Sequence, residues 1–107
     1  MFKRLFPIFT ATLAATVPLL FTSAAQADDI AEGKAKAQSC AACHGKEGIS
    51  SIPMYPNLAG QKQMYFEMQM KAFRDGSRPN PIMANFAKPL TDEDIRQIAA
   101  YYASLKH

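Results

Sequence analysis

The 107-residue chain has only two cysteines and two histidines, and this shortage argues against several kinds of site. A structural zinc ion needs four ligands, usually two cysteine pairs or a cysteine pair with a histidine pair. Here only Cys40, Cys43, His44 and the terminal His107 could bind it, and adjacent Cys43 and His44 are poorly placed around one tetrahedral ion. A disulfide between the two cysteines would close a very small loop and add little stability.

The sequence also lacks a strand pattern, an internal repeat and a stripe of basic residues. Without a βαβ pattern, the cysteine pair does not suit a thioredoxin-like redox protein. The missing basic stripe argues against a nucleic-acid partner. No group of His, Asp, Glu or Ser residues has a catalytic pattern, since Asp92, Glu93 and Asp94 are more typical of a helix start. We therefore expect a protein without enzyme activity of its own.

The scarce residues form one motif, Cys40-Ala41-Ala42-Cys43-His44, with the C-x-x-C-H pattern of c-type haem attachment. Two thiols at this spacing reach the two vinyl groups on one edge of a porphyrin. The histidine that follows lies under the iron and can offer an axial imidazole nitrogen. The sequence predicts one covalent haem c held by Cys40 and Cys43, with His44 as a ligand of the iron.

Residues 1–27 have the pattern of a cleaved secretory signal peptide. Lys3 and Arg4 precede an uncharged, mostly apolar stretch, and Ala25-Gln26-Ala27 has the A-x-A form of a cleavage site. The stretch is just under spanning length and contains prolines, which disfavours the alternative of an uncleaved membrane anchor. Cleavage would leave one domain, residues 28–107, without a membrane span. Because bacterial haem attachment takes place outside the inner membrane, we expect it in the periplasm.

Removal of the signal peptide changes both the charge and the size of the protein. The full chain has 12 basic and 9 acidic residues, or +3, and loss of Lys3 and Arg4 leaves 10 against 9, or +1. Domains this small usually need a disulfide, a metal or a cofactor to stabilise them. A haem would supply a large apolar surface for short helices to pack on, so the chain without haem should be poorly folded.

Helical patterns predict an all-α domain with three main helices. An Ala-rich run, Ile30–Ala37, follows Asp28 and Asp29, which stand at the expected N-cap. Gly33 is costly within this helix and suggests a close helix crossing. The second helix, Gln61–Asp75, has a stripe of apolar residues and ends at Gly76; the stripe contains Phe66, Met70 and Phe73.

The third helix is predicted from Asp92 to about Leu105. Thr91-Asp92-Glu93-Asp94 has the pattern of a capping box, with acidic groups at the positive end of the helix. Two segments rich in glycine or proline, 45–60 and 77–89, are predicted to be loops. The buried stripe of the last helix should consist of Ile95, Ile98, Tyr102 and Leu105, with Tyr101 at its margin.

In these features the sequence resembles the class I c-type cytochromes, in particular the small bacterial cytochrome c-553 group and single domains of two-haem relatives. The resemblance covers most of residues 30–105 and implies the cytochrome c fold, with three main helices and loops around one haem. Besides the haem motif and the Gly33 helix, it rests on a methionine loop and on three segments: Pro56-Asn57-Leu58-Ala59-Gly60-Gln61, Phe73-Arg74-Asp75-Gly76-Ser77-Arg78 and Leu90-Thr91-Asp92-Glu93-Asp94-Ile95 leading into Ala99-Ala100-Tyr101-Tyr102.

The resemblance implies a methionine sulfur as the second axial ligand of the iron. Met83 lies where the family places this ligand, and Met54 is the alternative. The resemblance also implies that the Pro56 carbonyl accepts the Nδ1–H of His44 and that Gly33 meets the last helix near Tyr101. Met64, Met68 and Met70 are interpreted as core residues, and Tyr65, Arg78 and Asn85 are the candidates for the haem propionates.

Histidine–methionine ligation leaves no open position on the iron and favours its ferrous state. The expected function is therefore one-electron transfer by a monomeric carrier that docks transiently on larger redox proteins. Two alternatives remain open. The first is a haem-based sensor, which requires a labile sixth ligand, and the second is a small electron-transfer subunit of a periplasmic oxidoreductase.

Overall fold

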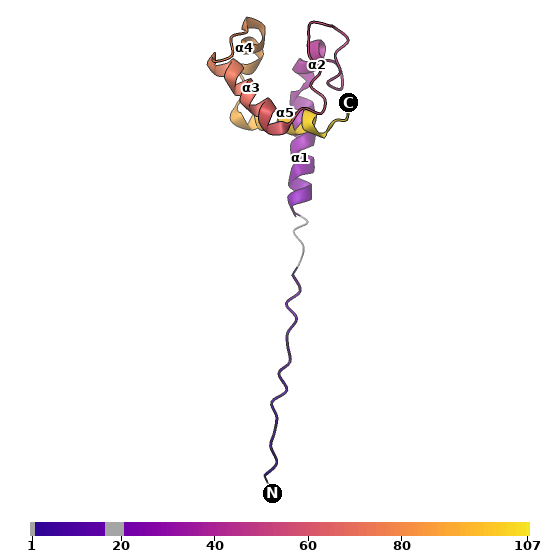
Figure 1. The fold of residues 1–107 in the computed structure, drawn as a ribbon, viewed down its shortest axis with the longest axis vertical. Helices are drawn as coiled ribbons and strands as arrows, with labels where there is room; N and C mark the ends of the chain where they lie inside the picture. The colour runs from indigo at the N-terminus through magenta and orange to yellow at the C-terminus, as the bar shows by residue number, and fades with distance from the viewer. Residues whose placement is uncertain (1, 17–20) are drawn as a thin grey trace.

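The computed structural model of the protein describes residues 2–16 and 21–107. This part of the chain contains no strands and has five helices: α1 (Phe21–Lys36), α2 (Gln38–His44), α3 (Gln63–Asp75), α4 (Pro81–Ala87) and α5 (Asp92–Ser104). Figure 1 shows α3 and α4 on one side of an open U and α2 with the loop after it on the other. The prediction of an all-α protein is confirmed.

Helix α1 begins earlier than predicted. It starts at Phe21, so Asp28 and Asp29 lie within the helix and the prediction that they cap it is wrong. Alanines before Asp28 have the highest helix propensity and allow the helix to extend toward the N-terminus. Residues 2–16 form neither helix nor strand and lead away from the helices (Figure 1). None of the described helices is long and apolar enough to cross a membrane.

The core lies where α1 and α3 pack against α5. Phe66, Met70 and Phe73 of α3 are buried as predicted, and their rings and thioether face the buried stripe of α5. That stripe is wider than expected because Tyr101 is buried rather than marginal, whereas Leu105 is only partly buried. The buried residues of α5 are Ile95, Gln97, Ile98, Ala99, Ala100, Tyr101 and Tyr102.

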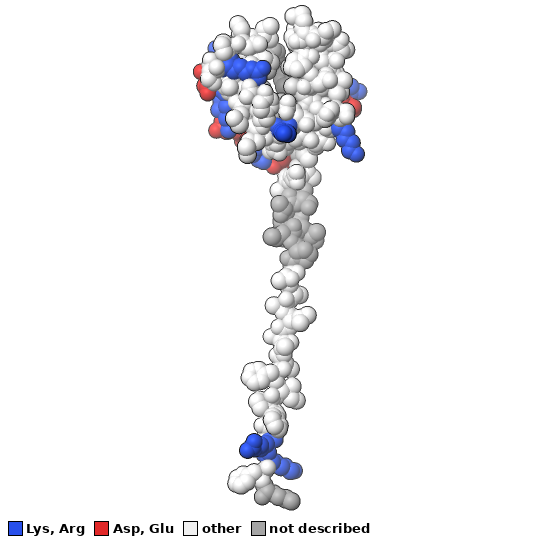
Figure 2. Space-filling model, viewed as in Figure 1, with Lys and Arg blue, Asp and Glu red and all other residues white. Residues whose placement is uncertain are grey.

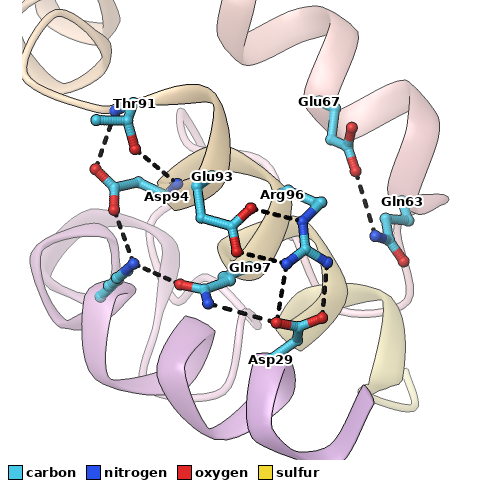
Figure 3. Close-up of polar contacts among 9 residues, drawn as sticks. Asp29, Gln63, Glu67, Thr91, Glu93, Asp94, Arg96 and Gln97 are labelled. Atoms are coloured by element: carbon cyan, nitrogen blue, oxygen red, sulfur yellow. Dashed lines mark hydrogen bonds and ion pairs between the residues drawn. The ribbon is translucent and has the colours of Figure 1, made fainter. Parts of the chain in front are cut away.

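A polar network joins the exposed side of the contact between α1 and α5 (Figure 3). Arg96 binds Asp29 with two nitrogens, at 2.7 and 2.9 Å, and also donates to Glu93 of its own helix at 2.6 and 2.9 Å. The amide of Gln97 reaches Asp29 at 3.4 Å. Lys36 hydrogen-bonds Gln97 and pairs with Asp94 at 2.8 Å. The two helices are therefore held by charge pairs beside their apolar contact.

The segment predicted as a loop at 77–89 contains helix α4, so that prediction is wrong in part. Asn80 caps this helix, and its Oδ1 accepts from the backbone N–H groups of Ile82 at 3.1 Å and Met83 at 3.0 Å. Pro81 stands in the first turn, where its missing N–H costs nothing. The preceding helix ends as predicted at Gly76, which has the left-handed conformation (φ 86°).

Candidate haem-binding site

A cavity of about 440 Å³ lies between α2 with its following loop and the pair α3 and α4. Its size is within the range of small-molecule and cofactor sites. Figure 2 shows the surface hollowed at this place, between two parts whose facing rims carry few charged groups. Both thiols of the predicted motif, His44 and Met83 line the same cavity. The structure thus brings together all four residues predicted to hold the haem.

Helix α2 positions the motif. It is a single short helix from Gln38 to His44, so Cys40 and Cys43 are one turn apart, and both line the cavity. Both cysteines are free thiols of intermediate exposure. Burial raises the pKa of the Cys40 thiol. This arrangement presents two thiols along one wall of a cavity, as attachment to one porphyrin edge requires.

The imidazole of His44 is oriented by a backbone carbonyl. Its Nδ1 lies 2.8 Å from the oxygen of Pro56, and the side chain is buried. A carbonyl oxygen only accepts, so Nδ1 carries the proton and the other ring nitrogen is free to bind a metal. The expected contact between His44 and Pro56 is therefore present in the fold. Tyr55 lies beside the imidazole, with 6.2 Å between the ring centres.

Hydrogen bonds within the loop from 45 to 62 hold the Pro56 carbonyl in place. The carbonyl of Gly48 accepts from the N–H groups of Leu58 at 2.7 Å and Ala59 at 3.0 Å. Asn57 accepts from the N–H of Ser50 at 2.7 Å. Gly48 has φ +73°, a conformation that side chains rarely adopt, and a β-carbon there would lie 2.7 Å from the Ala59 nitrogen. The loop closes only because this position is a glycine.

The methionines differ sharply in their surroundings. Met83 lies in α4, is partly buried and packs against the core. Met54 also lines the cavity, but 83% of it is exposed, so it is the less constrained of the two. Met70 is buried, whereas 75% of Met64 and 59% of Met68 are exposed. The interpretation as core residues is correct for Met70 and wrong for Met64 and Met68, which lie on the outer face of α3.

Two of the three propionate candidates line the cavity. These are Tyr65 and Arg78, whereas Asn85 is exposed and is not one of the lining residues. The guanidinium of Arg78 lies 4.5 Å from the centre of the Phe73 ring and donates to Gln69 at 2.8 Å. A charged group held in this way at the wall could bind a carboxylate.

The residues that the sequence interpretation missed come from α3, α4 and the segments beside them. Gln69 and Asn80 are polar lining residues, and Asn80 could have been found from the Asn-Pro pair that typically starts a helix. Several of the other missed lining positions are apolar and become visible only when the helices are packed: Leu58, Phe86, Ile82 and Leu90.

The residues present fit a covalent haem. The cavity offers two thiols for its vinyl groups, an imidazole and a thioether for its iron, an arginine for its carboxylates and apolar walls for its ring. Among the described residues, no group of three or more His, Cys, Asp or Glu could hold a separate metal ion. The fold and the cavity together define a class of protein, the single-haem c-type cytochrome domain.

Comparisons with known proteins lead to the same class. Residues 25–101 match the family described as cytochrome C oxidase, cbb3-type, subunit III. The chain is 48% identical to cytochrome c-554(548) of Halomonas halodenitrificans, covering 73% of this chain and 98% of that protein. It is 35% identical to the thiosulfate dehydrogenase electron acceptor of Thiomonas intermedia, covering 97% of this chain and 48% of that protein.

A solved structure of Acidithiobacillus ferrooxidans cytochrome c4 superposes with a TM-score of 0.68 at 35% identity, covering 72% of this chain and 49% of the other. The chain belongs to the cytochrome c family, whose domains carry covalent haem c, and it has the cytochrome c fold. It spans nearly all of the Halomonas protein but only about half of the cytochrome c4 and of the electron acceptor.

Proposed function

We propose that the protein is a periplasmic one-electron carrier whose haem is attached through Cys40 and Cys43 and ligated by His44 and Met83. The observation that supports this most strongly is that one cavity is lined by the two thiols, the Pro56-oriented imidazole and the partly buried thioether. Bound there, haem c supplies a reversible one-electron couple. A thioether opposite an imidazole leaves no coordination position for a substrate and favours ferrous iron.

The rim of the cavity supports transient docking of redox partners. Four of its lining residues are large and exposed, at 83% for Met54, 55% for Ile82, 47% for Tyr65 and 41% for Phe86. A rim that is mostly apolar, with Arg78 as a charged lining residue, suits small, short-lived interfaces, which weak electron-transfer pairs use. With a charge near +1 after cleavage, we expect the contact to depend weakly on ionic strength.

The optical spectrum tests the ligation. We expect the wild-type ferric protein to show the weak long-wavelength band of a sulfur ligand, and the ferrous protein not to respond to carbon monoxide. Met83→Ala should lose the band and bind carbon monoxide. Met54→Ala is the matched control and should keep the wild-type spectrum. If the wild-type protein binds carbon monoxide readily and Met83→Ala does not change this binding, the protein is a ligand sensor and not an electron carrier.

A second candidate function is that of a dedicated acceptor for a sulfur-compound dehydrogenase. It is favoured by the relation to the electron acceptor of thiosulfate dehydrogenase, which aligns with 97% of this chain. The test is stopped-flow reduction of the ferric protein by a purified thiosulfate dehydrogenase and, in parallel, by an unrelated redox enzyme. Saturable reduction by the first alone supports a dedicated acceptor. Equal rates with both support a general carrier.

The export proposal rests on the pattern of residues 1–27 and on the need for haem attachment outside the inner membrane. Cleavage after Ala27 would shorten α1 to a helix beginning at Asp28, and the Asp29–Arg96 pair would then lie at its first turn. Mass spectrometry of the periplasmic protein should give residues 28–107 plus one haem. A mass that includes the first 27 residues would show that the segment is retained.

A further inference from the structure

The end of α5 and the segment after it hold the loop from 45 to 62, here called the haem loop, from outside. The backbone carbonyl of Tyr102 accepts two hydrogen bonds, from the N–H of Leu105 at 3.2 Å and from the N–H of Gly60 at 2.8 Å. The first bond ends α5, and the second ties the haem loop to the same oxygen. In Figure 1 the yellow segment after α5 accordingly runs beside the loop that follows α2.

His107 packs on the haem loop at this place. A β-carbon at Gly60 would lie 2.1 Å from Nδ1 and 2.6 Å from Cε1 of the His107 ring. The imidazole therefore occupies the space that a side chain at position 60 would fill, and it covers the backbone of Gly60 from the solvent side. Leu105 is partly buried against the core, whereas Lys106 is exposed. The segment is thus fastened by Leu105 and by His107, with an exposed residue between them.

The part of the haem loop under His107 is connected to the ligand side of the cavity. A backbone hydrogen bond of 3.1 Å closes residues 58–61 into one turn, which contains Gly60. Pro56 stands directly before this turn, lines the cavity and accepts from His44 at 2.8 Å. A displacement of the turn would therefore also displace the Pro56 carbonyl from the imidazole.

We propose that the segment 105–107 is a strap over the haem loop, and that His107 is a positioning residue for the iron ligand His44. The strap acts through Gly60 and keeps the Pro56 carbonyl within hydrogen-bond distance of the imidazole. When the strap is released, the haem loop opens more often and the Nδ1–H of His44 meets water. The proposal rests on ligation of the iron by His44 and does not depend on which methionine is the second ligand.

The contact of the imidazole with the haem loop is small, so its loss should have a local effect. Loops open in local steps of low free energy, whereas the helices of a core open only in larger unfolding events. Loss of the ring should therefore raise the exchange rate of loop hydrogens with solvent and leave α3 unchanged. Two protons report on the opening: the N–H of Gly60, bound to Tyr102, and the Nδ1–H of His44, bound to Pro56.

The test is hydrogen exchange of these two protons, followed by NMR in the haem-loaded ferrous protein. His107→Ala should accelerate both by a factor on the order of three to ten, as expected for the loss of one partly exposed packing contact. His107→Phe keeps a planar ring over Gly60 and should restore slow exchange. Lys106→Ala, at the neighbouring exposed position, is the matched control and should exchange as the wild type does.

The proposal is overturned if both protons exchange in His107→Ala at the wild-type rate. It is also overturned if the amides of Phe66 and Met70 in α3 accelerate equally, since the variant would then be less stable as a whole. Faster exchange at Gly60 without a change at His44 would show that the strap does not act on the iron ligand, and would overturn it too. Absence of the long-wavelength ferric band in the wild type would instead contradict the proposed sulfur ligation, so the two failures are distinguishable.

Discussion

Gly33 of α1 lies directly against the backbone carbonyl of Gln97 in α5. A β-carbon at Gly33 would be 1.9 Å from that oxygen and 3.0 Å from the β-carbon of Tyr101. A mid-helix glycine costs about 1 kcal/mol relative to alanine, and this contact is what offsets the cost. The close crossing predicted from one misplaced glycine is therefore confirmed. The crossing of α1 and α5 fixes where the haem motif lies relative to the core, because α1 leads into the motif and α5 forms part of the core.

We predict that Gly33→Ala destabilises the haem-loaded protein by roughly 1–3 kcal/mol or more, the usual cost of overpacking. Helix propensity alone would favour this change by about 1 kcal/mol, so the two effects have opposite signs. The measurement is thermal unfolding of the ferrous protein. Ala35→Gly, at an exposed position of the same helix, is the control and should lose only about 1 kcal/mol. A Gly33→Ala protein as stable as the wild type would refute the crossing.

Features that depend on a few adjacent residues could be predicted from the sequence. The capping box at Thr91 and Asp94 is present with both hydrogen bonds, and α3 ends at Gly76 because glycine adopts the left-handed conformation without strain. The start of helix α4, which was not predicted, also depends on adjacent residues, since Asn80 and Pro81 form a typical helix start. Proline is common both in loops and in the first turn of a helix, so the prolines of this segment alone do not distinguish the two.

Side-chain pairs between distant parts of the chain could not be predicted. The pair between Asp29 and Arg96 joins positions 67 residues apart, and no periodicity reports such a partner. Asp29, predicted to cap a helix, lies inside α1, and its carboxylate pairs with Arg96 of α5. Within the site, the haem motif was predictable from its spacing. The hydrogen bond of His44 to the Pro56 carbonyl depends on how the following loop folds back over the motif.

We predict that Thr91→Ala destabilises the protein by about 1 kcal/mol, because the N–H of Asp94 loses its acceptor. Thr91 also stands where α5 meets the segment after α4, so the loss should appear in global unfolding. Thr91→Ser keeps the hydroxyl and serves as the control. The denaturant concentration at the unfolding midpoint should be the same for the serine variant and the wild type, and lower for the alanine variant. Equal midpoints for the two variants would show that the cap contributes nothing.

Asp94 should make the protein sensitive to acid. Hydrogen bonds from Lys36 and from the N–H of Thr91 lower the pKa of Asp94 to about 2, from its ordinary value of 3.8. A folded-state pKa below the unfolded one means that the stabilisation is present above pH 3.8 and is lost as pH falls to about 2. Asp94→Asn should therefore lower stability at neutral pH and weaken the fall in this window.

Unfolding midpoints measured from pH 6 down to about pH 2 check the role of Asp94. Glu32→Gln, on an exposed part of α1, is the matched control and should follow the wild-type curve. Acid sensitivity that is the same in Asp94→Asn and in the wild type would assign the effect to other carboxylates. The pairs of Asp29 and Asp92 with arginines are the first alternatives, since their pKa values are also lowered.

The carbonyl of Pro56 should influence the haem potential through His44. A hydrogen bond from Nδ1–H makes an imidazole more electron-rich, which favours ferric iron. Pro56→Ala keeps the carbonyl but frees the backbone that places it, so the bond of 2.8 Å should weaken and the potential should rise. Stability should fall by about 0.4–1 kcal/mol. Pro53→Ala, in the same loop, is the control, and voltammetry of both proteins decides. A stability loss in both variants without a change in potential would mean that Pro56 only shapes a turn.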